Sequence, residues 1–164
     1  SQHYDQLLTN RELLHKYIER ALLIKKRIIE ADEFDLSTRR VMNYGHSFGH
    51  AIESATNFGI PHGIAVSIGM DMANYTAMKL GLTTTSHYER MHSTLEKNYT
   101  SCSHIPIAPD GFLHAITKDK KNTDSHLVLI LPNTEGKIEI TPCSNTKEFQ
   151  ETCREFLSNL GRHS

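Results

Sequence analysis

The spacing of apolar positions along the chain predicts a mostly helical protein. Residues 10–31 carry an amphipathic pattern in which Asn10 is suited to cap the first turn. Lys25 falls on the apolar stripe of this helix, where another aliphatic residue is expected. A second helix is predicted over residues 37–56, entered through the Ser-Thr pair near its start.

The pattern continues with a strong helix over residues 63–80, which Gly81 ends. Small residues recur every four positions along it and would let another helix approach closely. The remaining predicted elements are helices over 85–99 and 109–117, strands over 126–131 and 137–141 joined by a turn at 133–136, and a helix over 145–160 that Gly161 ends. We therefore predict a mainly α fold with one small β-hairpin, as a single domain over residues 1–164. No strand, glycine-rich loop and helix occur in succession, so no nucleotide-binding half is predicted.

Composition and charge narrow the classes of partner. The 164 residues carry a formal net charge of -1 without a long run of one sign, which argues against a nucleic-acid or membrane-surface partner. No stretch has the apolar length of a membrane span, and we expect a cytoplasmic location. The three cysteines are widely spaced, which favours reduced thiols. Histidine is unusually frequent, with 11 residues.

Most of the candidate chemistry lies in the segment RRVMNYGHSFGHAIESATNFGIPH, residues 39–62. On one continuous helix, Arg39, Asn43, His46 and His50 are spaced by four, three and four residues, which places them on one face. Such a face is costly to bury unless it meets a metal ion, an anion, or both.

Two alternatives remain open for these histidines when only the residues are considered. His46 and His50 have the spacing of a metal-binding pair, and His62, after a Gly-Ile-Pro turn, is placed to add a third imidazole. So many histidines give nearly one such pair by chance, however, so solvated or core histidines are equally compatible. Lys25 either extends its ammonium to solvent or faces an anion-binding cleft. The basic cluster at residues 118–121 is either a solvated loop or an anion site.

The motifs NYGHSFGHAIE and PHGIAVSIGM resemble the signature of the 3-dehydroquinate synthase family of sugar-phosphate cyclases. The family pattern is close to N-x-G-H-[TS]-x-G-H-A-I-E, followed by H-G-E-A-V-x-x-G-M. The sixteen positions between His46 and His62 agree with it. The resemblance extends upstream through Lys25 and Arg39, and downstream to the segment DKKN at 119–122.

This resemblance implies the C-terminal half of a dehydroquinate synthase-like enzyme, which works with NAD and a divalent metal, zinc or cobalt. It implies that His46 and His62 are metal ligands, and that a glutamate of the N-terminal, NAD-binding half is the third. The implied catalytic residues are His50, Lys25 and Asn43. The implied substrate-binding residues are Lys25, Arg39, Asn43, His50, Lys120 and Lys121.

The implied reaction converts the sugar phosphate 3-deoxy-arabino-heptulosonate 7-phosphate to 3-dehydroquinate and phosphate, in the shikimate pathway of aromatic amino acid biosynthesis. The implied partners are the N-terminal half of the same protein and, at full length, a second copy in a homodimer. This chain departs from the pattern at Ile64, where the family has Glu. The departure leaves two alternatives: a related cyclase of the 2-deoxy-scyllo-inosose or valiolone synthase type, and a non-catalytic metal-binding domain of the same fold.

Overall fold

The structure is a computed structural model that describes residues 3–7, 9–32, 38–118 and 125–160. The chain divides into two compact units, residues 1–42 and 43–164. The elements of the first unit are α1 (Tyr4–Leu7) and α2 (Arg11–Ala31), followed by the 3-10 helix η1 (Thr38–Asn43), which ends at the boundary. Those of the second are α3 (His46–Ala55), α4 (His62–Lys79), α5 (Thr85–Tyr99), the 3-10 helix η2 (Thr100–Cys102), α6 (Pro109–Thr117), β1 (His126–Pro132), β2 (Ile138–Ser144) and α7 (Lys147–Asn159).

In the first unit, α2 begins where the capping pattern predicts. The side chain of Asn10 accepts a hydrogen bond of 3.0 Å from the backbone nitrogen of Leu13, which satisfies one of the free amides of the first turn. No residue of α2 is buried, and Ile18 on its apolar stripe is 50% exposed. After the helix, the Asp32 carboxylate accepts from the backbone nitrogen of Arg39 at 3.0 Å.

The single helix predicted over residues 37–56 is wrong. The structure has η1, then a break, and then α3, because Gly45 adopts a left-handed φ of 80° and interrupts the helical hydrogen bonds. Arg39 and Asn43 therefore do not share a helical face with the histidines of α3. Phe48 and Ile52 of α3 are both almost fully buried.

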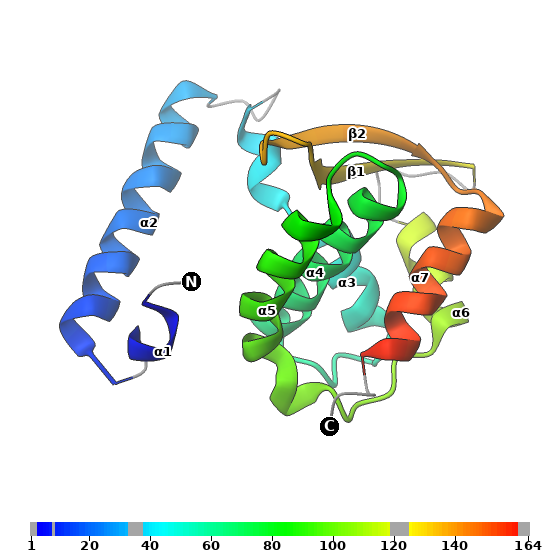
Figure 1. Cartoon of the computed structure of the whole chain (residues 1–164), viewed down its shortest axis with the longest axis horizontal. Helices are drawn as coiled ribbons and strands as arrows, with labels where there is room; N and C mark the ends of the chain where they lie inside the picture. The colour runs from blue at the N-terminus through cyan, green and yellow to red at the C-terminus, as the bar shows by residue number, and fades with distance from the viewer. Residues whose placement is uncertain (1–2, 8, 33–37, 119–124, 161–164) are drawn as a thin grey trace. The chain divides into compact units, whose positions relative to one another are not determined.

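The core of the second unit is built around α4, which packs against α3, α5, β1 and α7 (Figure 1). The small residues that recur along α4 are all buried: Ala65, Gly69, Ala73 and Ala77. The helix ends as predicted, with Gly81 at a φ of 72° and the amide of Leu82 donating to the carbonyl of Ala77 at 2.8 Å.

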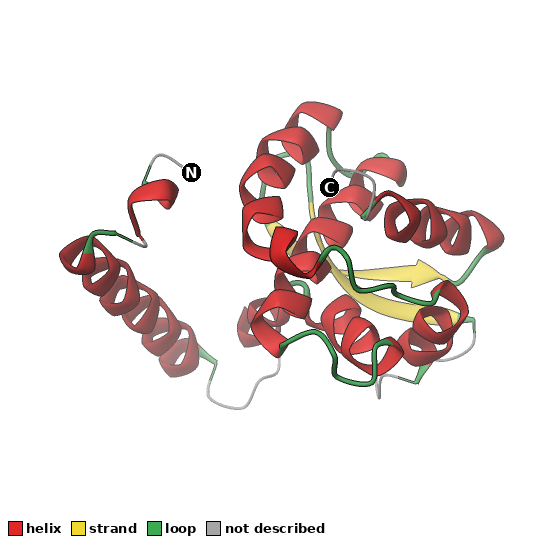
Figure 2. Cartoon of the chain, turned by 90° about the horizontal axis from the view of Figure 1, so that it is seen from below, coloured by secondary structure: helices red, strands yellow, loops and turns green. Residues whose placement is uncertain are grey.

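The predicted hairpin is confirmed, and with the helices it gives the predicted mainly α fold (Figure 2). β1 and β2 pair antiparallel, from His126 opposite Ser144 to Pro132 opposite Ile138. In the turn, the Asn133 side chain accepts from two backbone amides, which fixes the register. β1 contacts α4.

The predicted helices over 85–99 and 109–117 have the observed bounds of α5 and α6, and α7 lies within the predicted 145–160. Gly161, predicted to end that last helix, lies outside the described residues. The structure also contains α1 and η2, which the pattern did not predict. The cysteines are free thiols, as expected. Among the described residues, no helix has both the length and the apolar character needed to cross a membrane.

Candidate metal centre

Three imidazoles meet where the N-terminal turns of α3 and α4 come together. The ring centroids of His46 and His50 lie 5.6 Å apart, those of His46 and His62 also 5.6 Å, and those of His50 and His62 5.8 Å. His46 is half-buried, whereas His50 and His62 are exposed. The structure thus brings together the three histidines that the sequence selected as candidates.

α3 and α4 can lie this close together because Gly45, Gly49 and Gly69 have no side chains. A Cβ at Gly69 of α4 would lie 2.2 Å from the carbonyl oxygen of Gly45 and 2.7 Å from the backbone nitrogen of Gly49. A Cβ at Gly49 would in turn lie 3.0 Å from the Cα of Val66. Backbone therefore contacts backbone here, and this contact sets the distance between His46 and the start of α4.

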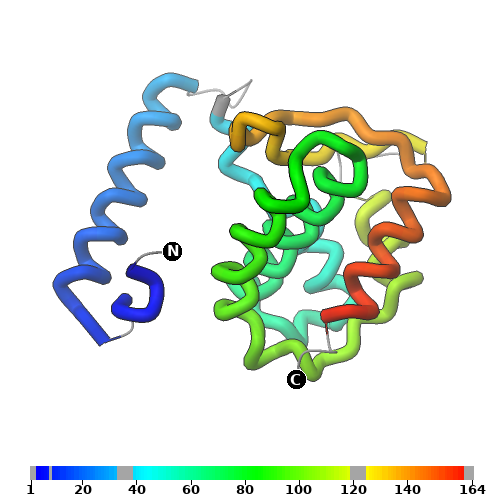
Figure 3. The backbone as a smooth tube through the Cα atoms, in the orientation of Figure 1, coloured from blue at the N-terminus to red at the C-terminus, as the bar shows by residue number. Residues whose placement is uncertain are grey.

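A tight reversal between α3 and α4 carries the chain back to His62, as the tube in Figure 3 follows. Asn57 and Phe58 both adopt the left-handed region, with φ of 49° and 58°. The amide of Phe58 donates to the carbonyl of Glu53 at 2.7 Å, and that of Gly59 to Thr56 at 2.9 Å. A left-handed conformation is unusual for a bulky residue such as phenylalanine, so this turn is strained.

Hydrogen bonds fix the orientation of two of the three rings. The Nδ1 of His62 lies 3.2 and 3.1 Å from the two carboxylate oxygens of Glu53, and the Nδ1 of His46 lies 3.4 Å from the carbonyl oxygen of Tyr44. Because these oxygens accept hydrogen bonds, both Nδ1 atoms carry the proton and both Nε2 atoms present a lone pair. Among the described residues, no oxygen acceptor forms a hydrogen bond with the ring of His50. The rings of His46 and His62 are therefore prepared as ligands through Nε2, in the way that metal-binding histidines usually are.

Sequence reasoning missed Glu53, which the structure adds to this cluster. Glu53 is only 8% exposed. One possible ligand atom from each of His50, Glu53 and His62 lies within 4.8 Å of the other two. The signal was present in the motif GHAIE, where His50 and Glu53 are three residues apart on one helical face. Its relation to His62 was hidden, because it depends on the reversal between the helices.

The electrostatics of the cluster favour neutral imidazole at His46. Burial lowers the pKa of His46. The hydrogen bond to the Tyr44 carbonyl opposes this in part, and the neighbouring rings of His50 and His62 lower the pKa further. Neutral imidazole is the form that binds metal. The donor set of imidazole nitrogens with a nearby carboxylate also suits zinc or cobalt, so the residues present fit a divalent ion.

The other candidate residues belong to other parts of the chain. Asn43 is half-buried at the end of η1, immediately before the glycine break. Lys25, exposed on α2, and Arg39 belong to the first unit. Lys120 and Lys121 lie outside the described residues. Ile64, in place of the family glutamate, is partly buried and packs against the core of the second unit.

Comparison with known proteins finds relatives of one family. The family profile described as 3-dehydroquinate synthase C-terminal matches residues 1–122. The 3-dehydroquinate synthase of Campylobacter curvus (strain 525.92) is 35% identical over 150 residues, which cover 91% of this chain and 43% of that protein. That of Dictyoglomus thermophilum (strain ATCC 35947 / DSM 3960 / H-6-12) is 37% identical over 139 residues, covering 84% and 39%. The chain spans about two fifths of these relatives.

Solved structures with the same fold belong to other sugar-phosphate cyclases. A 2-deoxy-scyllo-inosose synthase complexed with carbaglucose-6-phosphate, NAD+ and Co2+ superposes with a TM-score of 0.75 and 26% identity over 88% of this chain and 42% of that one. A 2-epi-5-epi-valiolone synthase from Streptomyces hygroscopicus subsp. jinggangensis 5008, with NAD+ and Zn2+ bound, gives a TM-score of 0.61 at 23% identity, covering 89% and 39%. The latter likeness is one of fold alone.

Proposed function

This chain belongs to the 3-dehydroquinate synthase family, and from that membership we propose that it forms the metal- and substrate-binding half of a carbon–oxygen lyase. The proposed substrate is 3-deoxy-arabino-heptulosonate 7-phosphate, and the products are 3-dehydroquinate and phosphate, as part of the shikimate pathway of aromatic amino acid biosynthesis. The NAD-binding half would lie in the part of the protein that corresponds to the remainder of the relatives. A homodimer and a cytoplasmic location stay predictions.

The observation that supports the proposal best is the difference between the three histidines. His46 and His62 each have Nδ1 held by an oxygen acceptor, so we assign them as metal ligands through Nε2. A divalent ion bound there would polarise hydroxyl and carbonyl oxygens of the substrate. His50 is exposed and lacks such an acceptor among the described residues. We assign it to proton transfer, since imidazole both accepts and donates protons near neutral pH.

The remaining assigned residues bind the anionic groups of the substrate. Lys25 and Arg39 of the first unit are proposed to bind the carboxylate or hydroxyls, and one of Lys120 and Lys121 the phosphate, through charge-assisted hydrogen bonds. Asn43, next to the histidine cluster in sequence, is proposed to orient a substrate hydroxyl. NAD, held by the rest of the enzyme, would store the hydride that the reaction removes and returns.

Single substitutions in the assembled enzyme separate these roles. His46→Ala and His62→Ala should lower metal content and phosphate release together, because each removes a ligand. His50→Ala should lower phosphate release while metal content stays close to the unmodified level. Retained metal in His46→Ala, together with lost metal in His50→Ala, would overturn the assignment.

The isolated chain provides a second test. With NAD, zinc or cobalt and the heptulosonate phosphate, the purified 164 residues should release no phosphate above a blank without enzyme, because two histidines leave the ion without its third protein ligand. Addition of the separately expressed N-terminal half should restore activity. Turnover by the chain alone would contradict the division of labour between two halves.

A related cyclase is the second candidate. Two observations favour it: Ile64 stands where the family has a glutamate, and the superposed 2-deoxy-scyllo-inosose synthase carries carbaglucose-6-phosphate. Glucose 6-phosphate should replace the heptulosonate as substrate if this candidate is right. If the assembled protein binds metal but turns over neither compound, the non-catalytic alternative is favoured.

A further inference from the structure

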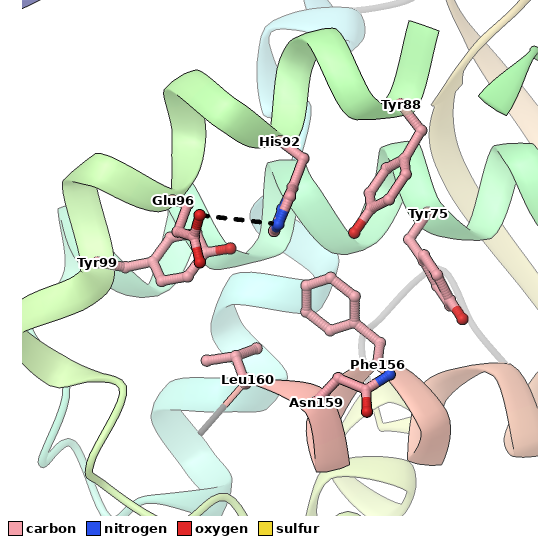
Figure 4. Close-up of a pocket in the computed structure, with 8 residues that line it drawn as sticks. All are labelled: Tyr75, Tyr88, His92, Glu96, Tyr99, Phe156, Asn159 and Leu160. Carbon is pink, nitrogen blue, oxygen red and sulfur yellow. Dashed lines mark ion pairs between the residues drawn. The ribbon is translucent and has the colours of Figure 1, made fainter. Parts of the chain in front are cut away.

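A pocket of about 310 Å³ lies between α5 and α7, over the C-terminal half of α4 (Figure 4). It is separate from the metal centre: Tyr75 in its wall follows His62 by thirteen positions on the same helix, or about 20 Å at 1.5 Å per residue. Phe156 of its opposite wall lies beyond residues 1–122, which the family profile matches. The volume is at the lower end of the range for small-molecule sites.

Aromatic rings form most of the wall. Tyr75 packs against Tyr88 at 5.3 Å between ring centroids and against Phe156 at 5.5 Å, and Tyr99 adds a fourth ring. The ammonium of Lys79 already lies 5.2 Å from the centroid of Tyr75. The Tyr75 ring therefore already makes a cation–π contact with a charged group of the protein, the ammonium of Lys79.

The charges around the pocket leave it negative. Asp71 is fully buried behind the wall, where its carboxylate accepts from His92 Nδ1 at 2.6 Å and from the Tyr99 hydroxyl at 2.5 Å. The hydrogen bond to Asp71 raises the pKa of His92, and the imidazole offsets the charge of that carboxylate when it is protonated. Glu96 remains: its carboxylate is 3.9 Å from His92 Nε2, too far for a hydrogen bond.

The ion pair between Lys79 and Glu155, outside the pocket, does not change the net charge of the pocket. The ammonium of Lys79 lies 2.9 Å from a carboxylate oxygen of Glu155, so that pair is neutral as a whole. Among the described residues that line the pocket, Glu96 is the one carboxylate, and it lies beside the aromatic rings, with its long ion pair to His92 dashed in Figure 4.

We propose that this pocket binds a small organic cation, namely a protonated amine that carries an apolar group of about the size of a phenyl ring. The ammonium lies next to Glu96 and the tyrosine rings, and the apolar group packs against Phe156 and Leu160. The anionic sugar phosphate of the proposed reaction has the opposite charge, so this is a different ligand at a different site. The inference does not depend on the proposed reaction.

The test uses two probes of equal shape, phenethylammonium and the uncharged 2-phenylethanol, titrated into the 164-residue chain by calorimetry and amide NMR. Phenethylammonium should bind at least about tenfold more tightly, with amide shifts centred on the lining residues of α5 and α7 and on Tyr75 of α4. Glu96→Gln should weaken its binding by about fivefold to tenfold. Glu89→Gln, an exposed carboxylate on the same helix outside the pocket lining, serves as the control and should leave binding unchanged.

Three results would overturn the proposal. Equal affinity for the two probes would show that charge is not recognised. Equal weakening by Glu89→Gln and Glu96→Gln would show only a general effect of surface charge. No saturable shift with either probe would show that the pocket does not bind this class of ligand.

Discussion

Gly69→Ala tests the backbone contact on which the candidate metal centre depends. The added Cβ would lie 2.2 Å from the Gly45 carbonyl oxygen, whereas ordinary contacts begin near 3.4 Å. The backbones must therefore separate by about 1 Å, because neither obstacle is a flexible side chain. Overpacking of this kind costs about 3 kcal/mol, and the better helix propensity of alanine returns about 1 kcal/mol. The net loss of about 2 kcal/mol should lower the Tm by about 4–8 °C.

Gly63→Ala is the matched control on the same helix, since a Cβ there meets no atom within 4 Å. It should raise the Tm by a few degrees at most, through helix propensity and a less flexible unfolded chain. Thermal unfolding followed by circular dichroism measures both variants.

Gly69→Ala should also lower the cobalt content of the assembled enzyme, because a shift of about 1 Å between His46 and His62 exceeds the tolerance of about 0.2 Å in metal–ligand distances. A Gly69→Ala chain that melts at or above the unmodified temperature would refute the described approach of α3 and α4. A lower Tm with full cobalt content would show that this contact does not set the histidine spacing.

Three further predictions concern carboxylates that hold a histidine. Glu53→Gln should weaken zinc binding by the assembled enzyme by about tenfold to a hundredfold, since the amide holds His62 less well; unchanged zinc affinity in calorimetry would contradict this. Tyr99→Phe should cost about 1–3 kcal/mol in urea unfolding, because buried Asp71 loses a donor, and an unchanged midpoint would contradict that network. Because the folded pKa of His92 is raised above 6.5, its stabilisation is complete below pH 6.5 and is lost as pH rises through the folded value. The difference in unfolding free energy between the unmodified chain and His92→Asn should therefore shrink as pH rises, and a constant difference would argue against it.

The helices and strands that begin or end at a capping or turn residue could be predicted from the sequence. Asn10 caps α2, Gly81 ends α4, and the Asn133 turn joins the two strands, and each signal acts within a few residues. The hairpin and the helices from α4 to α7 were found for this reason. The fold class followed from them, without knowledge of how the helices pack.

The helix predicted over residues 37–56 failed because its decisive interaction is not local. A helical spacing of polar residues continues through Gly45, so periodicity alone does not reveal the break. The left-handed conformation there is set by α4, whose Met70 backbone nitrogen would lie 2.7 Å from a Cβ at Gly45. Only glycine tolerates both that angle and that contact. The same tertiary contact places His46 at the start of a new helix.

The geometry of the candidate metal centre explains why the distance in sequence between His46 and His62 is fixed. His46 and His50 share a face of α3, but His62 reaches them only through the reversal after α3. That reversal holds Phe58 in a left-handed conformation, which costs about 1–2 kcal/mol and would not be selected for stability alone. The strain lies in the link that determines how far His62 is from His46. One residue more or less in the turn would rotate the start of α4 and move the Nε2 of His62 away from the cluster. The sixteen positions between these two histidines are therefore a geometric requirement of the site.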